Sequence, residues 1–249
     1  RSLFAQVITP ISDQIEHKLR YEILVRQFTH EGKQISPGQF LPALERYNLA
    51  TKLDEWVISA TFDFLHKQAD QITDIEYFSI NLSGQSLCDK QIHDLIVRLL
   101  GLTVIPAQKI VFEITETAAI ANMIEATKFI SSLKQYGCRF ALDDFGSGLS
   151  SFSYLKKLPV DFLKIDGLFV KAIVEDPINY AMVKSINEIG QLMGLGTIAE
   201  FVENGEILKK IKAINIYKGQ LVTETVAKDL AYLDLFQPLA TVLSKDNKV

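Results

Sequence analysis

The sequence predicts an α/β protein in which eight strands and their connecting helices form one closed barrel. Three observations support this prediction. Short apolar strand segments alternate with amphipathic helical segments along most of the 249 residues. Nearly all of the strand segments carry a polar group at or near their C-terminal end. An open sheet needs such groups only where its strand order reverses, whereas a barrel brings every strand end to one mouth.

The strands are expected where short runs are rich in β-branched and aromatic residues and are bounded by turn residues. They cover 3–9, 19–26, 77–83, 109–116, 138–142, 161–166, 196–200 and 215–222. The helices are expected from apolar residues that recur on one face, at 37–48, 53–66, 90–100, 119–137, 176–194 and 205–211. Asp176 and Pro177 form a typical helix start, and Gly137 a typical helix end. In the helix at 119–137 we expect Ile120, Ile124, Ile130 and Leu133 to face inward.

Composition limits the class of protein. Apolar residues make up 48% of the chain, which is enough for a large core, and the net charge of −4 provides no basic excess for a nucleic acid polymer or an anionic membrane surface. Cys88 and Cys138 are too few for a disulfide framework, and no apolar run is long enough to span a bilayer, so we expect a cytoplasmic domain. Residues 1–249 are expected to form a single domain. Because the chain starts at Arg1, we expect it to be part of a longer multidomain signalling protein.

The polar strand-end residues share one chemistry, because each offers an oxygen ligand: Glu22, Asn81, Glu113, Asp143, Asp144 and Glu200. Carboxylate and amide oxygens suit Mg²⁺ or Mn²⁺, and two such ions would relieve the repulsion between so many acids. A two-metal site is suited to phosphoester hydrolysis. Lys164 is expected to donate hydrogen bonds to the attacking water or to a phosphate oxygen, and Arg26 to hold a phosphate.

The segment after Asp143 and Asp144 is rich in glycine and serine, which allows the backbone to turn tightly and to approach a ligand. We expect Phe145 and Gly146 to contact the substrate. Taken alone, each of these polar residues is more often a helix cap or a surface charge than a ligand. Their repetition at successive strand ends favours a shared site.

Five motifs resemble those of the EAL domain family, which hydrolyses or binds cyclic di-GMP. They are Glu22-Ile23-Leu24-Val25-Arg26, Asn81-Leu82-Ser83, Glu113-Ile114-Thr115-Glu116, the stretch from Asp143 to Ser151, and Lys164-Ile165-Asp166. The resemblance covers nearly the whole chain, from Leu3 to about Leu235. It implies a TIM-like (β/α)8 barrel whose first strand runs antiparallel to its neighbours.

The resemblance also implies roles for individual residues. Glu22, Asn81, Glu113 and Asp143 would bind one metal ion, and Asp144 and Glu200 would complete the second site. Glu200 or Lys164 would activate water, with Asp144 beside them. Gln6 and Arg26 would contact cyclic di-GMP, Glu203 would support the site, and Glu116 would anchor the loop that starts at Asp144. Ca²⁺ is expected to inhibit, and a homodimer is expected through the loop and helix after the fifth strand, including residues 148–157.

Some positions depart from the family pattern. Ile23 stands where the family has alanine, Phe201 where it has glycine, Asn215 where it has aspartate, Lys218 where it has glutamine, and Thr225 where it has proline. If the backbone at Phe201 has a positive φ, the side chain would strain or reshape the strand end. With these departures, the resemblance still implies a cyclic di-GMP phosphodiesterase that forms pGpG. Two alternatives remain: a catalytically silent cyclic di-GMP receptor, and a barrel enzyme for another phosphoester.

Overall fold

The protein is described by a computed structural model that covers residues 1–11, 18–148, 152–216, 218–221 and 228–229. Its strands form one sheet in the order β11-β1-β3-β5-β6-β7-β8-β9-β10-β2, with β4 paired to β3. The strands are β1 (Ser2–Val7), β2 (Thr9–Pro10), β3 (Leu19–Phe28), β4 (Gln34–Ile35), β5 (Ile75–Leu82), β6 (Ile110–Thr115), β7 (Arg139–Phe145), β8 (Phe162–Ile165), β9 (Gly196–Val202), β10 (Lys218–Leu221) and β11 (Lys228–Asp229).

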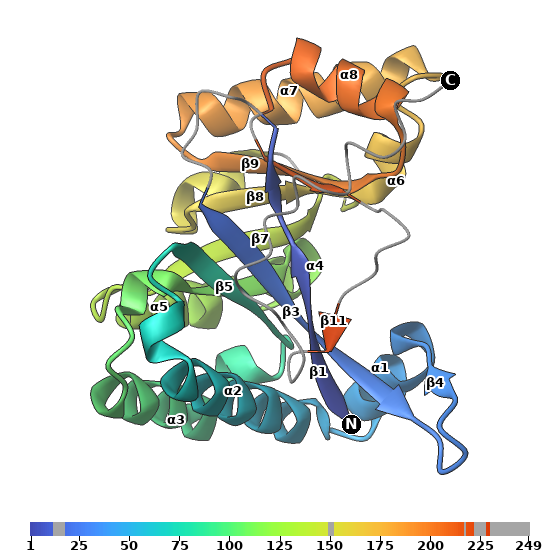
Figure 1. Cartoon of the computed structure of the whole chain (residues 1–249). Helices are drawn as coiled ribbons and strands as arrows, with labels where there is room; N and C mark the ends of the chain where they lie inside the picture. Colours follow the sequence, from blue (N-terminus) through green and yellow to red (C-terminus); the bar gives the residue numbers. More distant parts are fainter. Residues whose placement is uncertain (12–17, 149–151, 217, 222–227, 230–249) are drawn as a thin grey trace.

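Helices surround the outer side of this sheet (Figure 1). They are α1 (Pro37–Arg46), α2 (Ala50–Lys67), α3 (Lys90–Leu102), α4 (Glu116–Ala121), α5 (Met123–Lys134), α6 (Gly167–Lys171), α7 (Pro177–Leu192) and α8 (Gly205–Ala213), with 3₁₀ turns η1 (Ala69–Gln71), η2 (Ser86–Cys88), η3 (Ala107–Lys109) and η4 (Phe152–Lys157). In Figure 1, α7 and α8 lie beside β8 and β9, and α2 and α3 lie at the opposite side of the molecule.

The N-terminal strand segment closes the sheet into a barrel. β1 runs antiparallel to β3, with Gln6 opposite Glu22, and β2 runs antiparallel to β10, with Thr9 opposite Gly219. Because β1 and β2 are consecutive in the chain, the segment from Ser2 to Pro10 pairs with both ends of the parallel set β3-β5-β6-β7-β8-β9-β10. The antiparallel first strand that the resemblance implied is confirmed.

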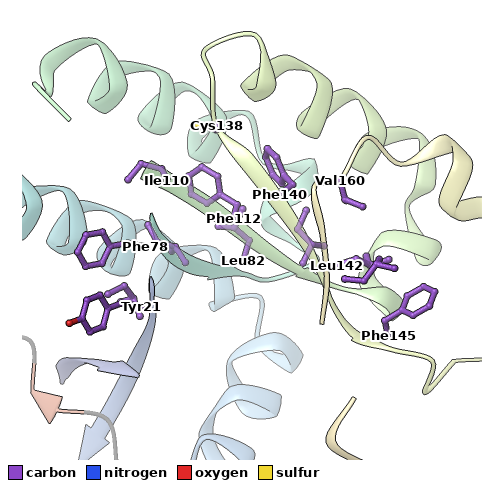
Figure 2. Close-up of a cluster of buried hydrophobic side chains, with 14 of the residues drawn as sticks. Tyr21, Phe78, Leu82, Ile110, Phe112, Cys138, Phe140, Leu142, Phe145 and Val160 are labelled. Atoms are coloured by element: carbon purple, nitrogen blue, oxygen red, sulfur yellow. The ribbon is translucent and has the colours of Figure 1, made fainter. Parts of the chain in front are cut away.

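Two apolar layers result from the alternation of side chains along each strand. The outer layer packs between the strands and the helices, and Figure 2 shows part of it, including Phe78, Phe112 and Phe140. The inner layer is a separate cluster inside the barrel, made of Ile8, Tyr77, Val111, Ala141, Phe162 and Ile198. At its lower edge, the Arg139 guanidinium lies over the rings of Tyr77 and Phe162, at 5.0 and 5.4 Å from their centroids.

The eight predicted strands match β1, β3 and β5–β10, and the short strands β2, β4 and β11 were not expected as separate strands. The helix predicted at 119–137 is two helices, α4 and α5, because the backbone at Asn122 (φ −133°, ψ 49°) interrupts it. This break changes which face turns inward, so Ile130 and Leu133 are buried, while Ile120 and Ile124 are exposed, contrary to the prediction. Thr225 and the end of the predicted strand at 215–222 lie outside the described residues.

Within the described part of the chain, no helix combines the length and the apolar character that a membrane crossing requires.

The two cysteines are expected to differ in reactivity. Cys138 is buried just before β7, and burial raises the pKa of its thiol to about 12, whereas Cys88 is exposed. At about pH 8 the reactive thiolate of Cys138 is therefore scarce, and its surroundings exclude the reagent. A colorimetric thiol titration should show one rapidly reacting thiol in the native protein and two after denaturation. Two equally rapid thiols in the native protein would contradict this packing.

Candidate functional site

The charged side chains of the barrel mouth lie next to the inner apolar layer, two residues further along the same strands. Val111, Ala141, Phe162 and Ile198 belong to that layer, and two residues later on the same strands come Glu113, Asp143, Lys164 and Glu200. Since side chains two residues apart point to the same side of a strand, the four polar groups must also point into the barrel. The register of the sheet brings Asn81 to the same place, because Asn81 on β5 lies opposite Glu113 on β6.

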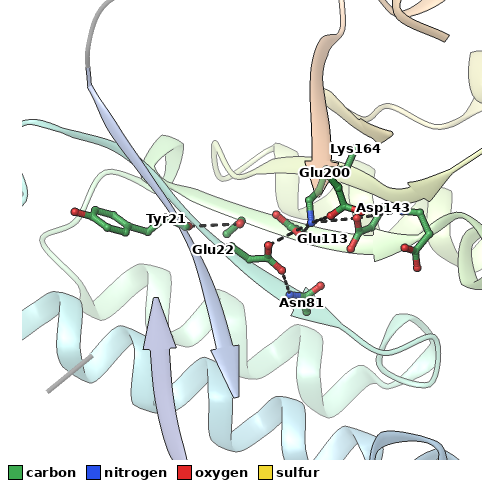
Figure 3. A network of polar contacts seen from close by, with 9 residues as sticks. Tyr21, Glu22, Asn81, Glu113, Asp143, Lys164 and Glu200 are labelled. Carbon is green, nitrogen blue, oxygen red and sulfur yellow. Dashed lines mark hydrogen bonds and ion pairs between the residues drawn. The ribbon is translucent and has the colours of Figure 1, made fainter. Parts of the chain in front are cut away.

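Lys164 lies at the centre of these acids (Figure 3). Its Nζ is 2.6 Å from Glu113 Oε2, 2.9 Å from Glu200 Oε1, 3.1 Å from Asp143 Oδ1 and 3.4 Å from Glu22 Oε2. The Lys164 side chain is 1% exposed, so these carboxylates replace the water that its ammonium would otherwise bind. Asn81 Nδ2 donates to Glu22 Oε1 at 2.8 Å and joins the network from its edge.

The pKa values of the side chains in this cluster depend on one another. Burial alone would lower the pKa of Lys164, but Asp143, Glu113, Glu22 and Glu200 raise it well above its usual value. Burial, followed by repulsion from Glu22, raises the pKa of Glu113 well above its usual value. For Glu200, burial is again the main cause and raises its pKa to about 8, although Lys164 opposes the shift. The site thus has more negative charge than one ammonium can neutralise.

Asp144 and Phe201 occupy equivalent irregularities at two strand ends. The pairing of β7 with β8 shifts register between Leu142 and Phe145, and that of β9 with β10 shifts between Gly219 and Leu221. Each irregularity contains a non-glycine residue with a positive φ, 53° at Asp144 and 50° at Phe201. A bulge lets neighbouring residues depart from strict alternation, so Asp143 and Asp144 can both face the mouth.

The strained backbone at Phe201 is stabilised by its side-chain contacts. The ring packs on Gly167, where an added Cβ would come within 2.1 Å of Phe201 Cδ2. Lys171 Nζ lies 4.1 Å from the ring centroid and 3.7 Å from Glu203 Oε1. Phe201 thus has the positive φ whose consequences were considered from the sequence. The Glu200 carboxylate nevertheless points to Lys164.

Glu116 holds the turn that follows Asp144. Gly146 N–H donates to Glu116 Oε2 at 2.9 Å, and Tyr154 Oη donates to Glu116 Oε1 at 2.5 Å. Gly146, after β7, and Tyr154, in η4, are thus both bound to one buried carboxylate. The structure places the Glu116 carboxylate beside the turn that follows Asp144.

The other predicted residues lie at different distances from the cluster. Gln6 is opposite Glu22, and Arg26 follows on the same strand face as Glu22, with burial lowering its pKa. Phe145 is fully buried against Phe152, and Gly146 turns its N–H toward Glu116. The placement of Phe145 differs from the expected substrate contact, because its ring belongs to the apolar layer between the strands and the helices. The expected contact of Gly146 with substrate stays a prediction, with its N–H bonded to Glu116 in this structure.

Glu203 also lies outside the Lys164 cluster, since its ion pair is with Lys171 on α6. Two residues with polar contacts around the mouth were not expected from the sequence: Tyr154, which donates to Glu116, and Asp54, which accepts from Ser83 N–H and Ser86 Oγ in the turn after β5. Tyr154 lies in a 3₁₀ turn and gives no local signal. Asp54 does give one, because it interrupts the buried face of α2 between Ala50 and Ile58.

The donor set of the mouth fits a hard divalent cation. One ligand oxygen from each of Asp143, Asp144 and Glu200 can be chosen so that all lie within 4.8 Å of one another. Glu22, Glu113 and the amide of Asn81 are adjacent through the Lys164 network. Oxygen ligands of this kind, with excess negative charge, are those that Mg²⁺ and Mn²⁺ prefer.

Comparison with known proteins agrees with this architecture. Residues 3–220 match the EAL domain. The chain is 42% identical over 201 residues to cyclic di-GMP phosphodiesterase PdeB of Shewanella oneidensis, covering 81% of this chain and 23% of PdeB. It is 40% identical over 223 residues to cyclic di-GMP phosphodiesterase PdeA of Borreliella burgdorferi, covering 88% of this chain and 32% of PdeA. The chain therefore spans only a quarter to a third of these relatives.

Solved structures of EAL domains have a similar fold. The FimX EAL domain of Pseudomonas aeruginosa bound to c-di-GMP has a TM-score of 0.80 at 27% identity, covering 88% of this chain and 87% of that one. The EAL enzyme Bd1971, bound to cAMP and cyclic di-GMP, has a TM-score of 0.84 at 26% identity, covering 92% and 62%. The match over most of the chain, together with the strand-end acids and the antiparallel first strand, shows that the chain belongs to the EAL domain family.

Proposed function

We propose that this domain hydrolyses cyclic di-GMP to linear pGpG. The single observation that supports this proposal most is the cluster of Glu22, Glu113, Asp143 and Glu200 around Lys164. Relatives named as cyclic di-GMP phosphodiesterases at 42% and 40% identity support the choice of substrate. In the reaction, a water oxygen bonds to phosphorus in one of the two phosphodiesters and the P–O3′ bond breaks. The leaving O3′ takes up a proton, so the product is the linear dinucleotide with a 5′-phosphate at one end and a free 3′-hydroxyl at the other.

Each residue has a proposed role in this reaction. Glu22, Asn81, Glu113 and Asp143 would hold one Mg²⁺ or Mn²⁺, and Asp144 and Glu200 would complete a second site. Such ions, when bound, lower the pKa of a water ligand and offset charge on the phosphate. Glu200 accepts the proton of the attacking water, and Lys164 donates a hydrogen bond to that water or to a phosphate oxygen. Gln6 and Arg26 contact the substrate at the β1–β3 side.

Three further features belong to the proposal. Ca²⁺ would occupy the site without supporting hydrolysis, because its larger radius and looser geometry misplace the water. The domain would form a homodimer through η4 and the segment before it, and it would be one signalling domain of a longer protein. Sedimentation of the purified domain tests the dimer, and a single monomeric species at micromolar concentrations would refute it.

A receptor that binds cyclic di-GMP without hydrolysis is the second candidate. The positive φ at Phe201, the residue after Glu200, favours it, because the family pattern has glycine at this position. Calorimetry in EDTA, run beside a turnover assay with Mg²⁺ or Mn²⁺, separates the two. Tight binding without turnover supports the receptor, and turnover supports the enzyme. Hydrolysis of generic phosphodiesters without any binding of cyclic di-GMP would indicate a different substrate.

Removal of one acid should strongly reduce turnover. In Glu22→Ala, a carboxylate is lost from the cluster and Asn81 loses its partner. We expect the rate of pGpG formation, followed by liquid chromatography, to fall by about 100-fold or more, since loss of even an outer-shell partner costs about 10–100-fold. The matched control is Glu188→Ala, which removes an exposed acid from α7. An equal loss in both variants, or none in Glu22→Ala, would contradict the assignment.

Removal of the central cation should destabilise the protein. Lys164→Met leaves buried carboxylates without their partner, which typically costs about 3–5 kcal/mol. We expect a lower midpoint of thermal unfolding in EDTA, partly restored by Mn²⁺ because a divalent ion can replace the lost charge. The control is Lys184→Met at an exposed ion pair, with an expected change within about 0.5 kcal/mol. Equal unfolding midpoints for wild type and Lys164→Met in EDTA would be incompatible with this cluster.

The stability of the metal-free protein should depend on Glu200 ionisation. Its pKa is raised to about 8 in the folded protein, so the folded state binds this proton more tightly than the unfolded state. The favourable contribution is complete below the unfolded pKa of about 4.5 and is lost as the pH rises through about 8. In EDTA, the unfolding free energy of wild type relative to Glu200→Gln should therefore fall between about pH 5 and pH 8. A difference independent of pH would show that the Glu200 pKa is not raised.

A further inference from the structure

Asp54 is a buried carboxylate that the proposed reaction does not use. It lies on α2, with 7% of its surface exposed, among apolar neighbours such as Leu53 and Val57. A carboxylate in such a place must be compensated by hydrogen bonds, because burial of an unpaired charge is costly. Burial raises its pKa, and hydrogen bonds from Ser86 and Ser83 oppose the shift.

The partners of Asp54 both belong to the turn that leaves β5. Its Oδ2 accepts a hydrogen bond from Ser83 N–H at 2.8 Å and another from Ser86 Oγ at 2.6 Å. Ser83 Oγ also lies 3.3 Å from Ser86 Oγ and accepts from Ser86 N–H at 3.4 Å. One oxygen atom of α2 therefore holds the first residue after β5 and the start of η2 together.

This turn immediately follows Asn81, the strand-end amide of the site. Ser83 is two residues after Asn81, and Asn81 Nδ2 donates to Glu22 Oε1 at 2.8 Å. The same turn also packs closely on α4, because a Cβ at Gly84 would lie 3.1 Å from Ala118 Cβ. The turn is thus confined between α2 and α4, and its position sets where the Asn81 side chain enters the mouth.

We propose that Asp54 is a positioning residue for the metal site, acting through Ser83 and Ser86 to orient Asn81 toward Glu22. This inference rests on the proposed function, because it assigns Asn81 to the metal-binding set. Asp54 itself touches neither substrate nor ion. Its hydrogen bonds instead keep the backbone after β5 from moving when the Asn81 amide is engaged.

The test is Mn²⁺ binding to the purified domain without substrate, followed by electron paramagnetic resonance. Asp54→Ala removes the acceptor of both bonds, and we expect Mn²⁺ affinity to fall by about 10-fold or more, the size typical of a lost outer-shell partner. Ser86→Ala removes one bond and should give a smaller loss. Asp54→Asn keeps an acceptor oxygen of the same shape and should restore much of the affinity. Ser86→Ala and Asp54→Asn keep the test decisive if Asp54→Ala does not fold.

The matched control is Asp161→Ala. Asp161 also accepts from a backbone N–H, that of Phe140 at 2.9 Å, but at the start of β7, far along the strand from the mouth. This variant should lower the unfolding midpoint and leave Mn²⁺ affinity within about 2-fold of wild type. A general loss of stability would weaken binding in both variants, whereas positioning weakens it only in the Asp54 and Ser86 variants.

Amide hydrogen exchange gives a readout that needs no metal. In EDTA, the Ser83 amide should exchange at least about 10-fold faster in Asp54→Ala than in wild type, because its acceptor is gone. Unchanged exchange, or unchanged Mn²⁺ affinity in a folded Asp54→Ala, would overturn the inference and leave the proposed function intact. A wild-type protein that binds no Mn²⁺ would overturn both.

Discussion

The buried ammonium of Lys164 is the interaction on which the rest of the site depends. Four carboxylates from four different strands approach it, and none could remain ionised at such depth without a cation beside it. The barrel makes this approach possible, because parallel strands in register deliver their C-terminal ends to one place. The inner apolar layer beneath, which includes Val111 and Phe162, keeps water from the lower side of the cluster. Charge interactions are therefore stronger there than at a surface.

The surrounding structure maintains this arrangement through local departures from regular geometry. Bulges at Asp144 and Phe201 place non-glycine residues at positive φ, which costs about 1–3 kcal/mol each unless neighbours compensate. At Phe201 the neighbours are Gly167, whose missing side chain leaves room for the ring, and Lys171 over that ring. Substitution of the family glycine has thus been accommodated by packing on α6, and the Glu200 carboxylate keeps its contact with Lys164.

Buried carboxylates also hold the loops around the mouth. Glu116 on α4 binds both Gly146 and Tyr154, and Asp54 on α2 binds Ser83 and Ser86. In each case an acid outside the Lys164 cluster accepts hydrogen bonds from a segment that follows a strand with a polar end group in the mouth. These two sets of acids differ in their place in the fold. Those on the strand ends bring negative charge to the mouth, and those on the helices bind the segments that follow the strands.

The barrel and its strand-end acids could be predicted from the sequence, because alternation and strand-end polar groups are short-range patterns along each strand. The antiparallel first strand followed only from the resemblance to the EAL domain family, since the direction of a strand depends on its pairing with distant segments. The break at Asn122, which exposes Ile120 and Ile124, could not, since a helix interruption depends on packing between α4 and α5. Nor could the sequence place Phe145 in the core or Glu203 beside Lys171, because both follow bulges whose direction is set by the neighbouring strand. The sequence alone determined which groups meet at the mouth. Tertiary structure decided that Lys164 lies at their centre, because its distances to the acids arise only when the strands are in register.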